Sequence, residues 1–443
     1  MKVRRLPVDT GPAGWNEILP VAGAPEVLEE HITADWLVIG AGFAGLAATR
    51  RLAQLHPGAR IVLLEARRVG EGPAGRNSGF MIDLPHHLTS EGYGGQMESD
   101  RAEARANRAG IAFAAGMAGE FGLSQEAFNP SGKTNAAASE RGHKHNMDYA
   151  AHLANMGEAC EMLDAAQMRE MTGSTYYQSG LFTPGAVMIQ PALFVRSVAC
   201  GLKSGRVSVF ENSPVTELNR QGDWTARTAK GSVTAPRVIL GVNGHANSFD
   251  QFRGRLMHVH LYASMTRALT PEECRKLGGA ARWGVTPADP MGSTARRISG
   301  TGGDRIVVRN RFTYDPSMQV SEGRVARMAR DHDRSFAARF PALEGIGMEY
   351  RWGGRLCLSW NNVPALGEVD EGLYSACCQN GLGTAKGTLH GMLMAELASG
   401  ERSELLNEVM AQDAPRRLPP EPFACLGANA VMRWGERKAG REL

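Results

Sequence analysis

The chain has 443 residues, and its 49 Lys and Arg nearly balance its 46 Asp and Glu, which leaves a formal net charge of +3 at pH 7. With 43% hydrophobic residues, this composition is typical of a globular protein and argues against a nucleic-acid-binding chain. A chain of this length exceeds one hydrophobic core, so we expect two domains.

The seven cysteines are odd in number and form no CxxC pair. This pattern predicts free thiols in a reducing compartment rather than a disulfide framework or a zinc site. The N-terminal residues carry no apolar core segment, and no stretch reaches about 18 consecutive apolar residues. We therefore expect a cytoplasmic protein without a signal peptide or a membrane partner.

A glycine-rich turn follows the first apolar run of the chain. The motif GAGFAG at 40–45 comes directly after the run at 36–39, and a helix is predicted over 43–55. Glu65 closes a second apolar run at 61–64. This order is the Rossmann fingerprint, in which glycines let backbone N–H groups approach a pyrophosphate and the acid accepts a ribose hydroxyl. We therefore expect the chain to bind an adenine dinucleotide.

The next segments alternate between helical and strand-like patterns. Residues 1–33 are rich in Pro and Gly and are expected to drape over the surface. From 100 to 171 the composition is helical, and it includes a helix capped by Asp164 and ended by Gly173. This helical segment is a poor match to a nucleotide-binding sheet, so we assign it to a second domain.

Pro191 opens another helix, over 192–202, because proline is tolerated at the first helical position. Short strands are predicted over 207–210, 215–218 and 238–240, and they indicate a return to the dinucleotide domain.

Between 256 and 314 the pattern is that of an antiparallel sheet with one covered face. Its strand-like runs lie at 258–266, 295–299 and 305–309. Together with the helical segment, this sheet is expected to form a substrate domain.

The last glycine-rich unit follows a strand predicted over 373–377. Gly383, Gly387 and Gly391 recur every four residues, which places them on one face of a helix. Each glycine costs a helix about 1 kcal/mol relative to alanine, so we expect a closely packed strand and a bound cofactor to compensate.

Two segments resemble the flavin motifs of the D-amino-acid-oxidase-like superfamily, which includes glycine and sarcosine oxidases, and the nearest branch is that of gamma-glutamylputrescine oxidases. Residues 65–79 resemble the second flavin motif of that superfamily. Trp352-Gly-Gly, 362–367, 372–376 and 380–384 resemble its C-terminal flavin motif. The resemblance covers about residues 30–400 in the family's order and implies that the cofactor is FAD.

The resemblance implies an α/β plus α+β fold, in which a Rossmann-type FAD-binding domain carries a discontinuous substrate domain built on an antiparallel sheet and helices. The predicted boundaries are 34–85, 176–250 and 345–405 for the FAD-binding domain, 86–175 and 251–344 for the substrate domain, 1–33 for an N-terminal arm, and 406–443 for a C-terminal tail.

The fingerprint and the resemblance together assign a set of residues to the cofactor. By the resemblance, Arg76 and Asn77 lie beside the flavin, Val215 contacts adenine through its backbone, and Gly241 and Asn243 flank the ribityl chain or the pyrophosphate. The full set is Gly40, Gly42, Phe43, Ala44, Gly45, Glu65, Ala66, Arg76, Asn77, Ser78, Gly79, Val215, Gly241, Asn243, Gly354, Gly381, Leu382, Gly383 and Thr384.

The C-terminal flavin motif departs from the family pattern. By the resemblance, 381–384 offers N–H groups to the flavin N1 and C2 carbonyl. Leu382 stands where many relatives carry histidine, and Lys386 lies one position beyond a flavin-side lysine of some sarcosine oxidases. Cys357 lies near the position of covalent flavin attachment in sarcosine oxidases, but the following spacing is shorter, so we expect a non-covalent flavin and a buried thiol.

Histidines and arginines are the candidates for substrate contact. Among His86, His87, His258 and His260 we select His260, although surface or structural roles are the default for histidine. Three arginines of the predicted sheet could clamp a substrate carboxylate bidentately, or could belong to a solvated face. They are Arg297, Arg309 and Arg311, and the last two are expected to share a face.

The predicted activity is FAD-dependent oxidation of a primary or secondary amine or amino acid. Hydride transfer to flavin N5 gives an imine that hydrolyses, and O2 or another acceptor reoxidises the flavin. The expected partner is a small amine or amino acid, with or without a carboxylate, and not a nucleic acid. An FAD-dependent 2-hydroxy-acid dehydrogenase of the same superfamily is an alternative, because the flavin motifs do not distinguish oxidation of a C–N bond from oxidation of a C–O bond. That reaction would require a stronger base at the alcohol proton. A non-catalytic flavin-binding protein is a further alternative.

Overall fold

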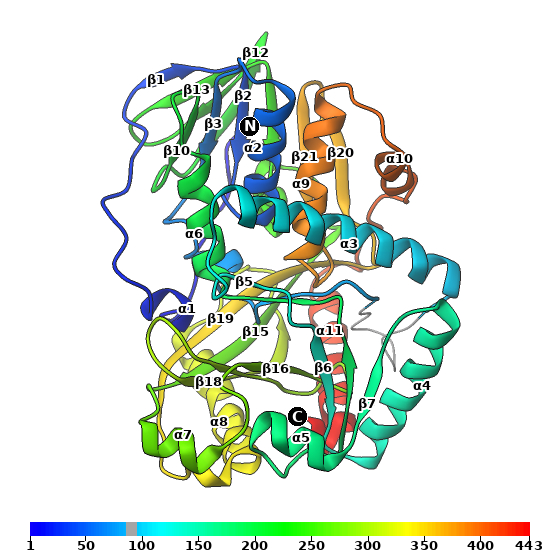
Figure 1. The fold of residues 1–443 in the computed structure, drawn as a ribbon. Coiled ribbons are helices and arrows are strands. Elements are labelled where there is room, and N and C mark those ends of the chain that lie inside the picture. The colour runs from blue at the N-terminus through cyan, green and yellow to red at the C-terminus, as the bar shows by residue number, and fades with distance from the viewer. Residues whose placement is uncertain (86–94) are drawn as a thin grey trace.

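The computed structural model describes residues 1–85 and 95–443. Two large sheets are stacked along the molecule, the upper one carrying helices α2 and α9 and the lower one carrying α8 and α11 (Figure 1). Among the described residues, no helix is long and apolar enough to cross a membrane.

The upper sheet has six strands, of which the first five in spatial order are parallel. Its spatial order is β10 (Val207–Phe210), β3 (Ile61–Leu64), β2 (Trp36–Ile39), β14 (Arg237–Leu240), β21 (Leu373–Cys377) and the antiparallel β20 (Ala365–Asp370). β2 and β3 are apolar at every position because both faces of the sheet are covered.

Alternate side chains of these strands enter two different hydrophobic clusters. Trp36 and Val38 pack with helices α2 (Phe43–Leu55), α6 (Pro191–Leu202) and α9 (Ala385–Ala398). Their neighbours on the other face pack with a four-stranded sheet. That sheet has the order β1 (His31–Thr33), β13 (Ser232–Ala235), β12 (Asp223–Arg227) and β11 (Glu217–Gln221). The strand predicted over 215–218 is therefore shifted and lies in this smaller sheet.

The lower sheet has eight strands and is antiparallel except where β16 pairs with β6. Its order is β19 (Met348–Ser359), β15 (Leu256–Thr266), β18 (Arg305–Tyr314), β17 (Thr294–Ile298), β16 (Trp283–Pro287), β6 (Lys133–Ala137), β8 (Ser179–Thr183) and β7 (Glu161–Leu163). A three-stranded sheet lies between the halves, with the order β4 (Phe80–Met81), β9 (Val187–Ile189) and β5 (Phe128–Asn129).

Five of the remaining helices begin after a residue whose side chain accepts a hydrogen bond from the first turn, namely Ser139, Asp164, Thr270, Ser321 and Ser403. Asp164 accepts a hydrogen bond from the Gln167 backbone and forms a capping box at the start of its helix, and Gly173 ends the helix in the left-handed conformation. These helices are α1 (Gly14–Glu17), α3 (Met97–Glu120), α4 (Glu140–Met156), α5 (Ala165–Thr172), α7 (Pro271–Leu277), α8 (Glu322–Arg339), α10 (Glu404–Met410) and α11 (Phe423–Ala439).

Strand pairing differs from the predicted domain boundaries. β8 lies within the predicted FAD-binding segment 176–250, and β19 within 345–405, yet both belong to the eight-stranded sheet. α3, which was predicted in the substrate segment, packs on α9 instead. The predicted tail 406–443 is also integrated, because Glu442 accepts hydrogen bonds from the Ala138 backbone at 2.9 Å and from the Ser139 hydroxyl at 2.6 Å. These pairings are long-range, so composition along the chain does not report them.

The glycines of α9 pack against a helix rather than the predicted strand. A Cβ atom at Gly391 would lie 1.9 Å from the carbonyl oxygen of Ala44 in α2. At Gly387 it would lie 3.3 Å from the Cβ atom of Phe43. Glycine therefore lets α2 and α9 approach to near backbone contact.

Candidate cofactor and substrate site

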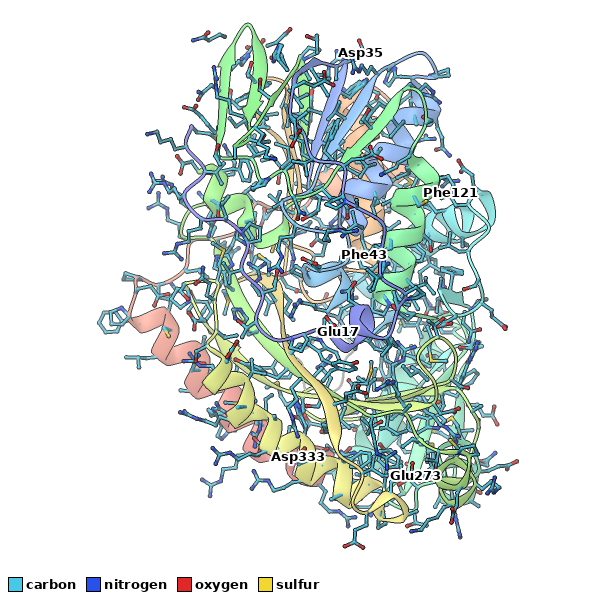
Figure 2. All side chains as sticks on the ribbon, turned by 90° about the vertical axis from the view of Figure 1, so that its left-hand side faces the viewer. Glu17, Asp35, Phe43, Phe121, Glu273 and Asp333 are labelled. Carbon is cyan, nitrogen blue, oxygen red and sulfur yellow. The ribbon has the colours of Figure 1, made fainter. Side chains whose placement is uncertain are left out.

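A cavity opens at the carboxyl ends of the central parallel strands. Gly40, Glu65 and Gly241 follow β2, β3 and β14, which are neighbours in the sheet, and all three line this cavity. Parallel sheets bind ligands at such a point, where connections diverge to opposite sides. The cavity continues to Tyr262 and Gly354 of the eight-stranded sheet. Phe43, at the start of α2, lies between the two sheets (Figure 2).

The three glycines of the fingerprint are required for two different structural reasons. Gly40 has φ +100°, and a Cβ atom there would lie 2.7 Å from the Gly241 carbonyl oxygen. At Gly45 a Cβ atom would lie 1.7 Å from the Gly40 carbonyl oxygen. At Gly42 the nearest atom would be the Ala74 Cβ, 3.6 Å away. Gly40 and Gly45 are therefore required by the turn, whereas Gly42 keeps the cavity open.

The start of α2 suits an anion. Gly42 caps the helix without a side chain, and within the described residues no side chain accepts a hydrogen bond from the N–H groups of the first turn. The N–H groups of that turn and the positive end of the helix dipole are therefore available to a pyrophosphate.

The Glu65 carboxylate is oriented by two backbone N–H groups. Ala41 donates to Oε2 at 2.8 Å and Arg67 donates to Oε1 at 3.1 Å. Burial is the main cause that raises the pKa of Glu65 above its ordinary value, and the two N–H groups oppose that shift. The carboxylate is thus positioned to accept a hydrogen bond from a ribose hydroxyl.

At the other end of the cavity, the loop that carries Arg76 is tightly bonded. Arg76 donates to the carbonyl oxygens of Glu71 at 2.6 Å, Thr10 at 3.1 Å and Gly353 at 3.1 Å. Asn77 donates to Ala74 O at 2.6 Å and accepts from the Gly79 N–H at 2.8 Å. The polar groups of both side chains therefore hold the shape of the loop beside the cavity.

Arg296 is a supporting residue that sequence reasoning missed. Its Nη1 donates at 2.9 Å to the carbonyl oxygens of Ser78, Gly79 and Ile189. Burial lowers its pKa to about 9. Arg296 thereby ties the predicted flavin loop to the eight-stranded sheet, and arginine in a strand gives no local signal of such a role.

The loop between β21 and α9 lines the same end of the cavity. Cys378, Asn380 and Gly381 have φ values of +57°, +49° and +90°, which bend the strand sharply into the helix. Asn243 accepts from the Cys378 N–H at 3.1 Å, and the Thr384 hydroxyl donates to Phe80 O at 2.6 Å.

Most of the predicted cofactor residues line this cavity. They are Gly40, Gly42, Phe43, Ala44, Glu65, Ala66, Arg76, Asn77, Ser78, Val215, Gly241, Asn243, Gly354, Gly381, Gly383 and Thr384. Gly45 lies behind the glycine turn, Gly79 lies against Arg296, and Leu382 packs in an apolar cluster with Phe80. These three shape the wall from behind.

The predicted arginine clamp is divided by a β-bulge. β18 pairs with β15 so that Phe312 faces Leu261 and Asn310 faces Tyr262, which leaves Arg311 as the extra residue, with φ +64°. A bulge of this kind breaks the alternation of side chains. Arg309 and Arg311 therefore do not share a face, contrary to the sequence prediction.

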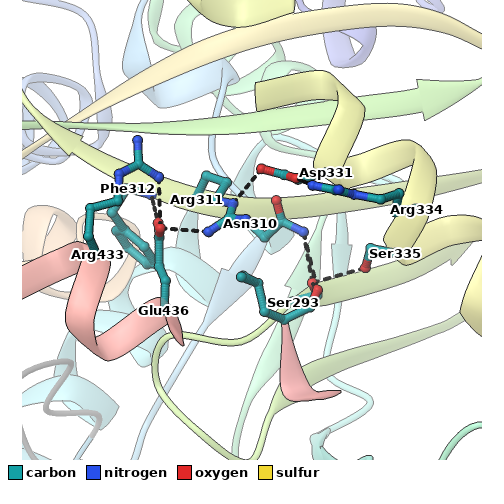
Figure 3. Close-up of polar contacts among 10 residues, drawn as sticks. Ser293, Asn310, Arg311, Phe312, Asp331, Arg334, Ser335, Arg433 and Glu436 are labelled. Carbon is teal, nitrogen blue, oxygen red and sulfur yellow. Dashed lines mark hydrogen bonds and ion pairs between the residues drawn. The ribbon is translucent and has the colours of Figure 1, made fainter. Parts of the chain in front are cut away.

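Arg309 lines the cavity, whereas Arg311 points toward the helices outside the sheet. Arg311 contacts Asp331 of α8 at 2.6 Å and Glu436 of α11 at 2.7 Å (Figure 3). Arg297 also lies outside the cavity, where it donates to Gly278 O at 2.7 Å and forms an ion pair with Asp304. Arg311 thus links β18 to helices α8 and α11, and Arg297 links β17 to the loops that carry Gly278 and Asp304.

The histidine selected from the sequence does not line the cavity. His260 is buried in β15, while His258 and His245 line the wall. Burial lowers the pKa of His258 to about 4 and of His245 to about 3. Both are therefore neutral at pH 7 and act as hydrogen-bonding groups. His86 and His87 lie outside the described residues.

Lys386 and Cys357 do not have the environments expected of the flavin-side residues with which the sequence analysis compared them. Lys386 forms an ion pair at 2.9 Å with Glu103 of α3. The Cys357 thiol lines the cavity, but a hydrogen bond with Cys378 and burial raise its pKa well above the ordinary value. A thiol held protonated is a poor nucleophile, which favours a flavin that is not covalently attached.

The N-terminal segment forms part of the wall, although the sequence predicted a surface arm. The residues that line the cavity are Val3, Arg5, Leu6, Pro7 and Asp9. Asp9 pairs with Arg355 at 3.1 Å, and Arg355 also donates to Nε2 of His245. The Pro- and Gly-rich composition gave no indication of these contacts.

A family model described as FAD dependent oxidoreductase (DAO) matches residues 35–397. The chain therefore belongs to the DAO family of FAD-dependent oxidoreductases. The two-sheet architecture confirms the predicted fold class.

Relatives and solved structures agree with this assignment. The chain is 26% identical over 417 residues to gamma-glutamylputrescine oxidoreductase of Escherichia coli (strain K12), covering 90% of this chain and 89% of that protein. Its fold is similar to glycine oxidase from Geobacillus kaustophilus, with a TM-score of 0.69, 18% identity, and coverage of 88% of this chain and 100% of that one. It is also similar to L-amino acid deaminase from Proteus myxofaciens, with a TM-score of 0.66, 16% identity, and coverage of 90% and 96%.

Proposed function

We propose that this chain binds FAD and oxidises the C–N bond of a primary or secondary amine or amino acid. The observation that carries the proposal is one continuous cavity that joins the dinucleotide fingerprint at Gly40 and Glu65 to Arg309 of the eight-stranded sheet. The names of three similar proteins, an oxidoreductase of gamma-glutamylputrescine, a glycine oxidase and an L-amino acid deaminase, support the substrate class.

The described residues fit FAD along its whole length. The N-terminus of α2 suits the diphosphate, Glu65 suits a ribose hydroxyl, and the N–H groups of 381–384 lie at the opposite end, beside the Arg76 loop. When bound, FAD supplies the acceptor for the hydride that leaves the carbon next to nitrogen. We place its reactive ring at the Arg76 end.

Arg309 is the group we assign to substrate binding. Its guanidinium would hold the carboxylate of an amino acid by two parallel hydrogen bonds. This contact would orient the Cα–H bond toward the cofactor. After the hydride leaves, the imine is hydrolysed by water, which releases ammonia or a primary amine and a carbonyl product.

The cavity histidines favour amines over 2-hydroxy acids. Oxidation of an alcohol requires a base that removes its proton. His258 and His245 have pKa values lowered to about 4 and about 3, and the Nε2 atom of His245 already accepts from Arg355. Among the described residues that line the cavity, the histidines are therefore weak bases.

Anaerobic bleaching of the flavin absorbance band tests the proposal directly. We expect bleaching by members of a panel of amines and amino acids, and none by the matching 2-hydroxy acids. Bleaching by hydroxy acids alone would establish the dehydrogenase alternative. A yellow protein that no member of either panel bleaches would support a non-catalytic flavoprotein. Admitting O2 after bleaching then separates an oxidase from a dehydrogenase.

A further inference from the structure

The N-terminal segment 1–12 crosses both halves of the molecule. Its backbone N–H groups at Val3 and Arg4 donate to Thr216 O at 2.9 Å and Ser248 O at 3.0 Å, on the Rossmann side. Thr10 accepts from the Gly353 N–H at 3.1 Å, and its hydroxyl donates to Val320 O at 2.6 Å, on the side of the eight-stranded sheet. The segment, which we call the N-terminal strap, is thus held at both ends.

The strap presents different residues to the cavity and to solvent. Val3, Arg5, Leu6, Pro7 and Asp9 line the cavity, and Val3, Pro7 and Asp9 are partly buried. Val8 lies outside this lining and keeps 47% of its surface exposed. The strap therefore forms a wall of the cavity.

Asp9 carries an unsatisfied carboxylate oxygen in this wall. Its side chain is 1% exposed, and its Oδ1 atom faces Nη2 of Arg355 at 3.1 Å. Its Oδ2 atom is buried and has no hydrogen-bond partner within residues 1–85 and 95–443, and the same is true of Nε of Arg355. Buried polar atoms are nearly always paired, so an unpaired carboxylate oxygen in a cavity wall indicates a ligand that donates a hydrogen bond.

Asp9 lines the same cavity as Glu65 and Arg76, which we assign to the two ends of the cofactor. Its charge contributes to raising the pKa of Glu65 and opposes the lowering of the pKa of Arg76 by burial. The strap also brings Arg5 to the cavity that Arg355 lines. A sugar hydroxyl donates a hydrogen bond as Asp9 requires, and a diphosphate carries the charge that Arg5 and Arg355 attract.

We propose that the N-terminal strap is part of the FAD site, and that it closes over the bound dinucleotide with Asp9 accepting a hydrogen bond from one of its sugar hydroxyls. This inference rests on the proposed binding of FAD. The family match begins at residue 35, so the strap lies outside the segment that defines the family. Linkage between two binding equilibria is reciprocal. If docking of the strap raises the affinity for FAD by some factor, then bound FAD must raise the equilibrium constant for docking of the strap by the same factor.

Limited digestion with trypsin tests the closure, because Lys2, Arg4 and Arg5 are cleavage sites within the strap. We expect added FAD to slow cleavage after Arg5 in the apoprotein at least about tenfold, followed by mass spectrometry of the intact chain. Equal rates of cleavage with and without FAD, whether fast or slow, would overturn the closure.

Substitution of Asp9 tests the contact itself. Asp9→Ala is expected to raise the Kd for FAD by about 10- to 150-fold, because a hydrogen bond to a charged group is lost. Asp9→Asn keeps the size of the side chain and is expected to cause a smaller increase. Val8→Ala is the matched control, because Val8 is the neighbouring outward residue, and it should leave the Kd unchanged.

The thermal midpoint of each apoprotein separates binding from structure. If Asp9→Ala lowers the midpoint but leaves the Kd for FAD unchanged, Asp9 is a structural residue and the inference is wrong. A wild-type chain that does not bind FAD at all would instead refute the proposed function. The inference is equally wrong if Asp9→Ala leaves both the thermal midpoint and the Kd for FAD unchanged.

Discussion

The two sides of the cofactor cavity are built from different interactions. On one side, α2 and α9 approach so closely that a Cβ atom at Gly391 would meet the Ala44 carbonyl oxygen at 1.9 Å. On the other side, the strap and the eight-stranded sheet are held by ion pairs such as Asp9 with Arg355. The glycine contact admits one packing arrangement, whereas a polar wall can be changed one side chain at a time. We infer that the first side positions the cofactor and the second determines what else the cavity binds.

The largest effect is expected from Gly391→Val, which breaks the close contact. The added side chain must push α9 away from α2, so we expect loss of several kcal/mol of stability and little folded protein. Urea unfolding followed by circular dichroism measures this. Gly387→Ala is the control, because its Cβ atom would lie 3.3 Å from Phe43 and removing a helical glycine recovers up to about 1 kcal/mol. If both variants unfold at the wild-type urea concentration, the helix contact is not rigid.

Gly42→Val is expected to abolish FAD binding while the protein remains folded. The Cβ atom has room, with Ala74 3.6 Å away, but the larger side chain would extend into the cavity where the diphosphate is expected. Glu65→Ala should weaken FAD binding less, by about 1.5–3 kcal/mol for the lost hydrogen bond. Titration of apoprotein with FAD, followed by flavin fluorescence, measures both. Wild-type affinity in both variants would contradict this location of the cofactor.

Arg309 and Arg311, which are close together in β18, provide a matched pair of variants on the side of the cavity formed by the strap and the eight-stranded sheet. Arg309→Ala should lower kcat/KM for carboxylated amines by about 10- to 150-fold and affect uncharged amines far less. Arg311→Ala should instead lower stability by up to about 3 kcal/mol, because Glu436 is 1% exposed and loses one of its partners. Steady-state kinetics and thermal unfolding of both variants separate these effects. A selective kinetic loss in Arg311→Ala would show that the bulge does not divide the two roles.

Acid should weaken the folded protein through its buried histidines. Burial lowers the pKa of His258 and His332 to about 4 and of His260 and His390 to about 3. These side chains stay neutral in the folded chain but take up protons in the unfolded chain below about pH 6.5. Stability should therefore be unaffected above that pH and fall by about 1.4 kcal/mol per pH unit for each histidine as the pH drops from 6.5 toward 4.

Urea unfolding at pH 7.5, 6.0 and 5.0 measures this slope. His332→Asn should reduce it by the share of one histidine. Stability that rises on acidification would contradict the assignment of neutral buried histidines.

Local patterns were sufficient to predict the elements whose defining residues are close in sequence. The helix over 43–55, the strands at 36–39 and 61–64, and the cap at Asp164 all depend on residues that are close in sequence. The site residues that sequence reasoning missed depend on contacts far along the chain. Asp9 meets Arg355, and Arg296 meets three carbonyl oxygens from two other segments. No periodic pattern or motif in the sequence predicts either contact.

The sequence predicted that the substrate sheet is antiparallel, but it did not predict the direction of every side chain. Alternation located β15 and β17 to within two residues and found the start of β18, but it missed the last five residues of β18. The sequence also predicted that Arg309 and Arg311 point the same way. One left-handed residue at Arg311 breaks that rule. Its φ value is set by the pairing with β15 and by helices α8 and α11, none of which is visible in the local sequence of β18.

This single extra residue has an evolutionary consequence. Loss of the extra residue Arg311 would restore ordinary alternation and keep the pairs Asn310 with Tyr262 and Phe312 with Leu261, so the side chains on either side would keep their surroundings. Such a deletion would leave Arg309 in the cavity wall and remove only the ion pairs of Arg311 with Asp331 and Glu436. Homologous chains that are one residue shorter at this position are thus the natural place to look for a different way of holding α8 and α11 against the sheet.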